Sequence, residues 1–187
     1  MKTPIYTERL TIRPLLIDDL DQVLTITGQP ETYTYIPEEP MGEMEARTMI
    51  ERGQNIPNVN DLPPDIAVTL TETKELVGLL SFNTVSNRFR AMEIGWMFHT
   101  AHRGKGYASE AARALMNCGF STLGIHRIIA ICDPRNIPSF RIMEKLGMRL
   151  EAEFVDSVIL SDGEWHNEYF YAITEKEWAN KFYQEEI

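Results

Sequence analysis

The sequence predicts a mixed α+β fold in which helices flank a mostly antiparallel sheet. Three observations lead to this prediction. Four segments with strand character precede residue 100, as in an antiparallel meander. Residues 91–132 then read as strand, loop, helix and fully apolar strand, the order of a parallel crossover. Two long strand-like segments joined by Asp-Gly come last, as in a hairpin.

Composition is typical of a soluble globular protein. The 187 residues contain 43% hydrophobic and 25% charged residues and are most simply one domain, residues 1–187. No apolar run approaches the ~20 residues that span a bilayer, and the first 13 residues show no signal-peptide core. We therefore expect a cytoplasmic protein without a membrane partner.

The net charge of −10 disfavours binding to nucleic acid and is compatible with a cationic acceptor such as an amine or a basic peptide. Cys118 and Cys132 lack the spacing of metal ligands and lie in apolar segments. We expect two buried free thiols, rather than a disulfide or a nucleophile, and no metal. The oligomeric state stays open between monomer and homodimer.

The first quarter of the chain predicts a strand and two helices. Ile5–Leu15 alternates apolar and polar residues, as a strand does. Asp18 or Asp19 can cap the helix that follows, which ends near Gly28 and has these apolar positions: Leu20, Val23, Leu24 and Ile26. A second helix is expected from about Met41 to Gly53.

Two loops surround this second helix, at residues 31–40 and 54–65, and we expect them to form the acceptor side of a cleft. Residues 55–65 contain three prolines and predict a surface loop. Four side chains of the earlier loop could line the cleft: Tyr33, Tyr35, Glu38 and Glu39. An ordinary polar loop with a few packed rings is the simpler interpretation.

Three further strands lead to the middle of the chain. Ile66–Leu70 and Leu76–Val85 are joined by the polar turn 71–75 and predict a hairpin. After a turn at residues 86–88 comes the strand Ala91–Phe98, in which these apolar residues alternate with their neighbours: Met92, Ile94, Trp96 and Phe98.

The segment after that strand carries the strongest chemical signal. A loop at His99–Lys105 leads into a helix from about Gly106 to Phe120. A helix start offers unpaired N–H groups and a positive dipole end, and glycines at 104 and 106 allow a ligand to approach the backbone. Arg103 and Lys105 add positive charge. A phosphate site and a plain strand-to-helix turn both fit the six residues 103–108.

The last third predicts a strand, a helix, a hairpin and a terminal helix. His126–Cys132 is continuously apolar, as in a strand covered on both faces. Asn136 can cap the next helix, with Pro138 in its first turn and Gly147 just past its end. The remaining elements are strands Arg149–Leu160 and Trp165–Ile173, and a short helix capped by Thr174.

Several stretches resemble one known family. Arg103, Gly106 and Ala108 fill the Arg/Gln-x-x-Gly-x-Gly/Ala signature of the GNAT superfamily of N-acetyltransferases. TERLTIRPL, EIGWMF, DPRNIPSFRIMEKLGMR and DGEWHNEYFYAITEKEW are similar to its RimJ/RimL-type branch, which acetylates α-amino groups of ribosomal proteins.

The resemblance implies a mixed sheet of about seven strands in which 91–98 and 126–132 are parallel neighbours that splay apart, with Gly95 a bulge near the split. It implies acetyl-CoA as cosubstrate, with its acetyl carbonyl facing backbone amides around Met97 and Phe98. The full set implied for the coenzyme is Met97, Phe98, Arg103, Gly104, Lys105, Gly106, Tyr107, Ala108, Asn136 and Phe140.

Acyl transfer to an amine needs a neutral amine, a polarised carbonyl and a stabilised leaving thiolate. Glu93, on the central strand, could accept the amine proton, or could serve as a structural or substrate-anchoring carboxylate. Ser139 corresponds to a serine that such enzymes place beside the coenzyme sulfur, and equally suits a helix start.

Many members of the family use a tyrosine as general acid where this chain has Met143, which cannot donate a proton. Three spare acid–base candidates are left out of the catalytic set, because a lone histidine is more often a surface or structural residue: His99, His102 and His166.

Two classes of function follow. The first is acetyl transfer to a primary amine, most simply the N-terminal α-amine of a protein or peptide, with a polyamine, amino acid or aminoglycoside as alternative acceptors. The second is an acyl-CoA-binding module without catalysis, which Met143 keeps open.

Overall fold

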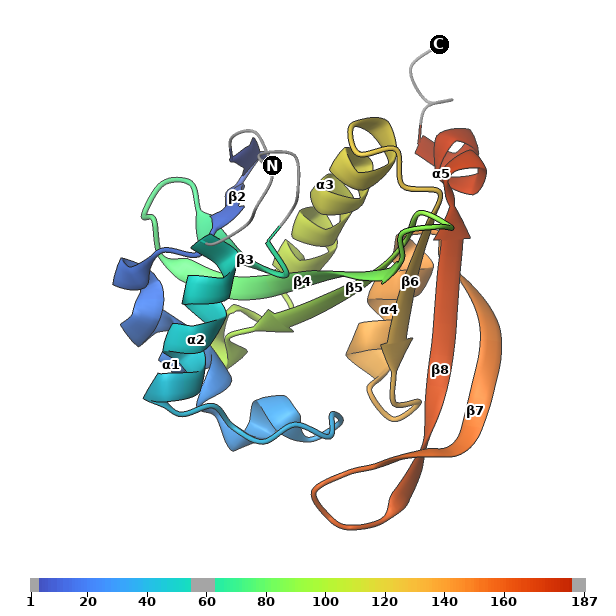
Figure 1. The fold of residues 1–187 in the computed structure, drawn as a ribbon. Coiled ribbons are helices and arrows are strands. Elements are labelled where there is room, and N and C mark those ends of the chain that lie inside the picture. Colours follow the sequence, from blue (N-terminus) through green and yellow to red (C-terminus); the bar gives the residue numbers. More distant parts are fainter. Residues whose placement is uncertain (1–3, 55–62, 183–187) are drawn as a thin grey trace.

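A computed structural model describes residues 4–54 and 63–182 (Figure 1). Its strands are β1 (Ile5–Tyr6), β2 (Leu10–Pro14), β3 (Asp65–Leu70), β4 (Leu76–Ser86), β5 (Ala91–Phe98), β6 (Arg127–Cys132), β7 (Arg149–Ile159) and β8 (Trp165–Thr174). Its helices are α1 (Leu20–Thr27), α2 (Glu43–Gln54), α3 (Tyr107–Ser121), α4 (Ile137–Lys145) and α5 (Glu175–Phe182), with short 3₁₀ turns η1 (Ile17–Asp19), η2 (Pro30–Tyr33) and η3 (Thr100–His102). Residues 55–62 of the predicted surface loop lie outside this description. None of the helices in residues 4–54 and 63–182 has the length and apolar character needed to cross a bilayer.

The eight strands form one sheet in the order β1-β2-β3-β4-β5-β6-β8-β7. Every neighbouring pair is antiparallel except β5 and β6, which are parallel and joined by α3. The predicted class, a mostly antiparallel sheet with one parallel central pair flanked by helices, is confirmed.

The eighth strand arises from a turn that the alternation pattern did not reveal. The predicted strand Ile5–Leu15 is two strands, because the chain reverses at residues 7–9 and β1 pairs back onto β2. Thr7 holds the turn, since its backbone N–H donates to the Leu10 carbonyl (2.9 Å) and its hydroxyl accepts from the Leu10 N–H (2.9 Å).

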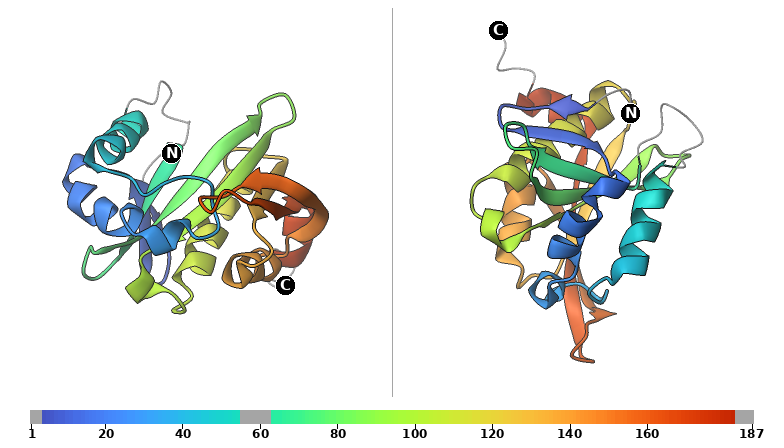
Figure 2. Two further views of the ribbon diagram at one scale, coloured as in Figure 1. Left: turned by 90° about the horizontal axis from the view of Figure 1, so that it is seen from below. Right: turned by 90° about the vertical axis from the view of Figure 1, so that its left-hand side faces the viewer.

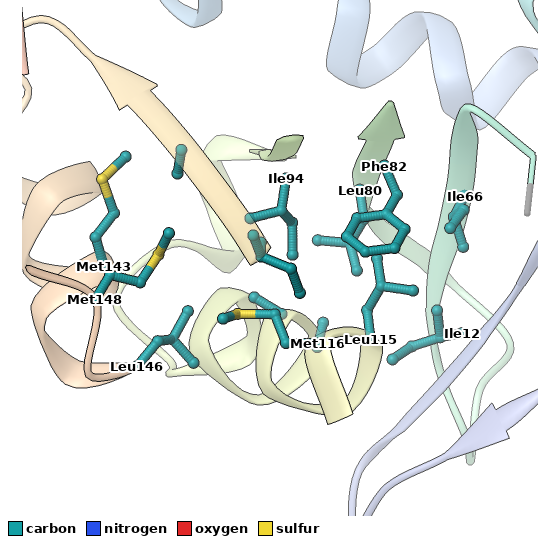
Figure 3. Packing of buried hydrophobic residues seen from close by; sticks show 14 of the residues in the cluster. Ile12, Ile66, Leu80, Phe82, Ile94, Leu115, Met116, Met143, Leu146 and Met148 are labelled. Atoms are coloured by element: carbon teal, nitrogen blue, oxygen red, sulfur yellow. The ribbon is translucent and has the colours of Figure 1, made fainter. Parts of the chain in front are cut away.

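Apolar side chains fill both faces of the sheet. On one face they lie between the strands and α3, α4 and α5, and Figure 3 shows Leu115 of α3 beside Leu80 and Phe82 of β4. Complete burial of such a side chain contributes roughly 1.5–3 kcal/mol. On the other face, α1 and α2 cover β3 and β4 (Figure 2, right). The cavity described below begins beside these two helices, over β5.

The parallel pair separates soon after it begins. β5 and β6 are in register only over Ala91–Glu93 and Arg127–Ile129, and beyond this the two strands diverge (Figure 1). The predicted bulge at Gly95 is wrong: Gly95 pairs regularly with Ser81 of β4, and the irregularity lies at Thr84/Ser86. Gly95 instead provides room, since an added Cβ would lie 2.5 Å from the Ser81 hydroxyl.

Helix ends largely follow the predictions. Asn136 caps α4 by accepting from the Ser139 N–H, and Gly147, at φ +83°, ends it with N–H bonds from Gly147 and Met148 to carbonyls inside the helix. Thr174 and Glu177 form the cap of α5. Asp19 is the exception: its carboxylate binds Arg13 and the N–H of Leu16, and caps no N–H of α1.

Candidate active site

The loop before α3 has the geometry of an anion site. Gly104 (φ +75°) and Gly106 (φ +83°) take left-handed conformations that glycine adopts without strain. The helix's hydrogen-bond ladder starts with the Glu110 N–H donating to the Gly106 carbonyl (3.1 Å), so the N–H groups of Tyr107, Ala108 and Ser109 precede it. These groups, together with the positive end of the helix dipole, can hold a phosphate.

The two basic residues of the loop are both exposed and differ in their contacts. Arg103 donates from Nε to the Phe98 carbonyl (3.1 Å) and reaches the Thr32 hydroxyl from Nη2 (3.5 Å). Arg103 therefore ties the loop to the end of β5. The backbone carbonyl of Lys105 accepts from Arg9 Nη1 (3.0 Å).

The end of β5 directs backbone groups into the opening between β5 and β6. The N–H of His99 donates to the carbonyl of Val77 in β4 (3.1 Å). Because peptide groups alternate in direction along a strand, those of Phe98 and Trp96 face the opening. That of Met97, which the sequence analysis included, faces β4; the Met97 side chain lines the cavity instead.

A cavity of about 390 Å³ extends from this opening. β5, β6, α4 and the segment that includes η2 all contribute to its wall. Its polar and aromatic lining includes Tyr33, Tyr35, Glu38, Asp65, Glu93 and Ser139. The structure thus brings both predicted catalytic residues to one cavity, together with three of the four loop residues proposed for the acceptor. Glu39 is exposed and lies outside the lining.

Glu93 is half-buried on β5 and has an acidic neighbourhood. Burial raises the pKa of its carboxyl group, and repulsion from Glu168 and Glu38 raises it further. A carboxylate in such surroundings is a stronger base and attracts a cation.

Ser139 lies in the first turn of α4, where its N–H donates to Asn136 Oδ1 (3.3 Å). It lines the cavity together with Cys132. Burial raises the pKa of Cys132 to about 12, although the Ser139 side chain acts to lower it. Both cysteines are free, as predicted; Cys132 is buried, whereas Cys118 is partly exposed.

Three other predicted positions on α4 have different surroundings. Asn136 lines the cavity. Met143 also lines it and is 1% exposed, which places a thioether at the position where the resemblance implies a tyrosine. Phe140 lies outside the cavity lining and packs edge-on against Tyr169, with ring centroids 5.9 Å apart.

The histidines have structural contacts and lie outside the cavity lining. His99 Nδ1 accepts from the Ala101 N–H (3.2 Å). His102 Nε2 lies 3.0 Å from Glu75, and His166 Nε2 lies 2.9 Å from Asp162. Their exclusion from the catalytic set stays a prediction.

Arg9 lies at the site without having been predicted from the sequence. Its side chain lies under the loop before α3, where it contacts Lys105, Tyr107 and Glu110. These partners are 96 to 101 residues away along the chain, so no local spacing could reveal the contact.

Several known proteins are similar to this chain in sequence and in fold. The profile of the acetyltransferase (GNAT) domain family matches residues 9–149. The uncharacterized N-acetyltransferase YnaD of Bacillus subtilis (strain 168) is 39% identical over 174 residues, which cover 93% of this chain and 98% of YnaD. The ribosomal protein uS5-alanine N-acetyltransferase of Escherichia coli (strain K12) is 32% identical over 109 residues, covering 58% of this chain and 56% of that enzyme.

A solved structure extends the likeness to three dimensions. The acetyltransferase (GNAT family) from Bacillus anthracis superimposes with a TM-score of 0.83 and is 37% identical, covering 93% of this chain and 99% of that one. The family profile, the full-length relative and this structure agree with one another. The chain therefore belongs to the GNAT family of acetyltransferases and is an N-acetyltransferase.

Proposed function

We propose that this protein transfers the acetyl group of acetyl-CoA to the N-terminal α-amine of a protein or peptide, with ribosomal proteins the first candidates. The observation that carries the proposal is the position of Glu93 and Ser139 on one cavity, beside the opening that leads to the α3 loop. A proton acceptor and a hydroxyl donor then lie on either side of the point where an acyl group and an amine would meet.

The residues of the loop fit acetyl-CoA, which supplies an acetyl thioester when bound. The N–H groups that follow Gly104 and Gly106 would hold its diphosphate, with Tyr107 and Ala108 in the first turn of α3. Arg103 and Lys105 add positive charge at the exposed rim.

The strands and α4 would hold the rest of the coenzyme. The peptide groups of Trp96 and Phe98 face the opening, where they can bond an extended chain or polarise a carbonyl. Asn136 lines the cavity at the start of α4. Phe140 would contribute indirectly, because it packs α4 against β8 through Tyr169 and so holds the start of α4 in place.

Glu93 would act as the base. Its burial and its repulsion by Glu168 and Glu38 favour uptake of the proton from a cationic amine. The Ser139 hydroxyl would donate a hydrogen bond to the departing sulfur. Met143 contributes shape alone, since a thioether carries no proton.

The acceptor side supports a cationic amine. Tyr33 and Tyr35 present aromatic rings, and Glu38 and Asp65 present carboxylates, to the same cavity as Glu93. The uS5-alanine N-acetyltransferase relative supports an α-amine in particular. An α-amine also needs less assistance, because its reference pKa of about 7.7–8.0 lies well below the 10.4 of lysine.

Release of free CoA from acetyl-CoA with an acceptor panel tests the proposal. The panel pairs an Ala-initiated basic peptide with the same peptide blocked at its α-amine, and adds a polyamine, an amino acid and an aminoglycoside. Turnover that vanishes when the α-amine is blocked supports the proposal. Equal turnover of the blocked peptide, or preference for a small amine, overturns the proposed acceptor.

A further inference from the structure

We propose that Arg9 is a positioning residue for coenzyme binding, because it fixes the orientation of the peptide that joins Lys105 to Gly106. This inference rests on the proposed function, since it assumes that the loop before α3 holds the diphosphate of acetyl-CoA. It assigns a role to the turn between β1 and β2, which lies outside the loop itself.

Three contacts hold the Arg9 side chain beneath the loop. Its Nη1 donates to the carbonyl of Lys105 (3.0 Å), and its Nε and Nη2 bind Glu110 Oε2 at 2.7 and 2.6 Å. Its guanidinium also lies over the ring of Tyr107, 4.7 Å from the centroid. One planar group thus contacts the residue before Gly106, the residue after it, and the first turn of α3.

The bond to Lys105 determines where the next N–H points. In a trans peptide the C=O of one residue and the N–H of the following residue point in opposite directions. Since the Lys105 carbonyl points toward Arg9 in the turn between β1 and β2, the Gly106 N–H is directed away from that turn. This is one of the loop's donors for a phosphate, and glycine lets the chain turn into α3 directly after it.

Glu110 fixes Arg9 in turn. Its carboxylate accepts from the Thr7 hydroxyl (2.6 Å), from the Arg9 backbone N–H (3.0 Å) and from the Arg9 side chain. Burial alone would raise the pKa of Glu110, but the hydrogen bonds from Thr7 and Arg9 outweigh it and lower the pKa. The carboxylate therefore stays ionised, and the pair is close to neutral. Arg9 thus acts by orienting the loop rather than by adding net charge to the site.

Gly106 lies in contact range of the Arg9 side chain. A Cβ built on Gly106 would lie 3.4 Å from Arg9 Nη2. The sequence predicts a small residue here because glycine allows a ligand to approach the backbone. The structure gives another reason: a φ of +83°, at which an L side chain is strained.

The test compares Arg9→Gln and Arg9→Lys with the wild type by calorimetry and steady-state kinetics. Each protein is measured with acetyl-CoA and with S-acetylpantetheine, which keeps the thioester but lacks the diphosphate. Arg47→Gln is the matched control, because Arg47 is also paired with a carboxylate and has similar exposure (48%, against 43% for Arg9) but lies on α2.

We expect Arg9→Gln to raise the Kd and KM for acetyl-CoA roughly tenfold, the scale of one lost hydrogen bond to a charged group. The Kd and KM of Arg9→Lys should lie between those of Arg9→Gln and the wild type, since one ammonium group cannot reproduce the hydrogen bonds to both Lys105 and Glu110. The kcat at saturating acetyl-CoA and the kcat/KM for S-acetylpantetheine should stay within twofold of wild type.

Unchanged acetyl-CoA affinity in folded Arg9 variants would overturn the inference, as would equal losses with both thioesters, which would indicate general loosening. Should Arg9→Gln fail to fold, Arg9→Lys supplies the comparison. Failure of the wild type itself to bind acetyl-CoA would instead refute the proposed function.

Discussion

Replacement of Glu93 by Gln should produce an acetyltransferase whose activity depends on the protonation of its substrate. Gln keeps the shape of the side chain but removes the negative charge that burial, Glu168 and Glu38 have made more basic. At pH 7 an α-amine with a pKa of about 7.7–8.0 is only about 10–17% neutral, and at pH 9 it is more than about 90% neutral. The variant should therefore lose much activity at pH 7 and regain roughly five- to tenfold by pH 9.

Lysine as acceptor would give a different profile. With a pKa of about 10.4, a lysine amine is still only about 4% neutral at pH 9. Its rate with the Glu93→Gln variant would keep rising without a plateau in that range. The shape of the profile therefore reports the acceptor as well as the role of the carboxylate.

The measurement is kcat/KM against pH, from 6.5 to 9.5, for wild type and Glu93→Gln with one good acceptor. Glu39→Gln is the control, because it makes the same substitution at an exposed residue outside the cavity lining. Parallel profiles for wild type and Glu93→Gln would show that Glu93 is not the base.

A stability measurement checks the same electrostatics independently. The folded-state pKa of Glu93 is raised, so ionised Glu93 destabilises the fold, and this cost appears as pH rises above the unfolded value of about 4.3. Glu93→Gln should therefore have a higher Tm than wild type at pH 7 to 8, and the difference should shrink below about pH 4. A lower Tm across the whole range would contradict the raised pKa.

Three further predictions concern the loop, α4 and the buried thiol. Gly106→Val should remain folded but bind acetyl-CoA at least about tenfold more weakly in calorimetry, because a β-branched residue is strained at φ +83° and its Cβ would contact Arg9; unchanged affinity would remove the loop from the site. Ser139→Ala should lower kcat on the order of tenfold to a thousandfold, more than it raises the KM for acetyl-CoA, and full kcat would leave the serine a helix-capping role. In a Cys118→Ser background, Cys132 should react with iodoacetamide at pH 8 only after unfolding, since a pKa of about 12 leaves about one thiol in 10⁴ ionised; rapid labelling of the folded protein would contradict this.

Local patterns predicted most of the fold. The alternation in β5, the apolar run of β6 and the end of α4 at Gly147 all appear where the sequence placed them. These features depend on neighbours within a few residues, so spacing alone reveals them. The break between β1 and β2 was missed because Thr7 holds it through a side chain, and a polar residue in a strand pattern looks the same whether or not the chain turns.

The site was predictable only in part, for a related reason. Glu93 was predicted from its place on the central strand and Ser139 from the family resemblance and its place at a helix start, and the structure brings both to one cavity. The acidic surroundings of Glu93 depend on Glu38 and Glu168, which come from opposite ends of the chain. The direction of the Met97 peptide group depends on the pairing register of β5 with β4. A shift of that register by one residue would turn the group from β4 to the opening.

The brief pairing of β5 with β6 divides the sheet into two blocks. β4 and β5 are in register over eight residue pairs and β6 and β8 over six, whereas β5 and β6 share three. Backbone hydrogen bonds thus join β1–β5 and β6–β8 through a narrow seam, with α3 crossing between them. We expect native-state hydrogen exchange to resolve two cooperative units with different opening free energies. A ligand that spans the gap would bond to both units, so its binding would make them unfold as one.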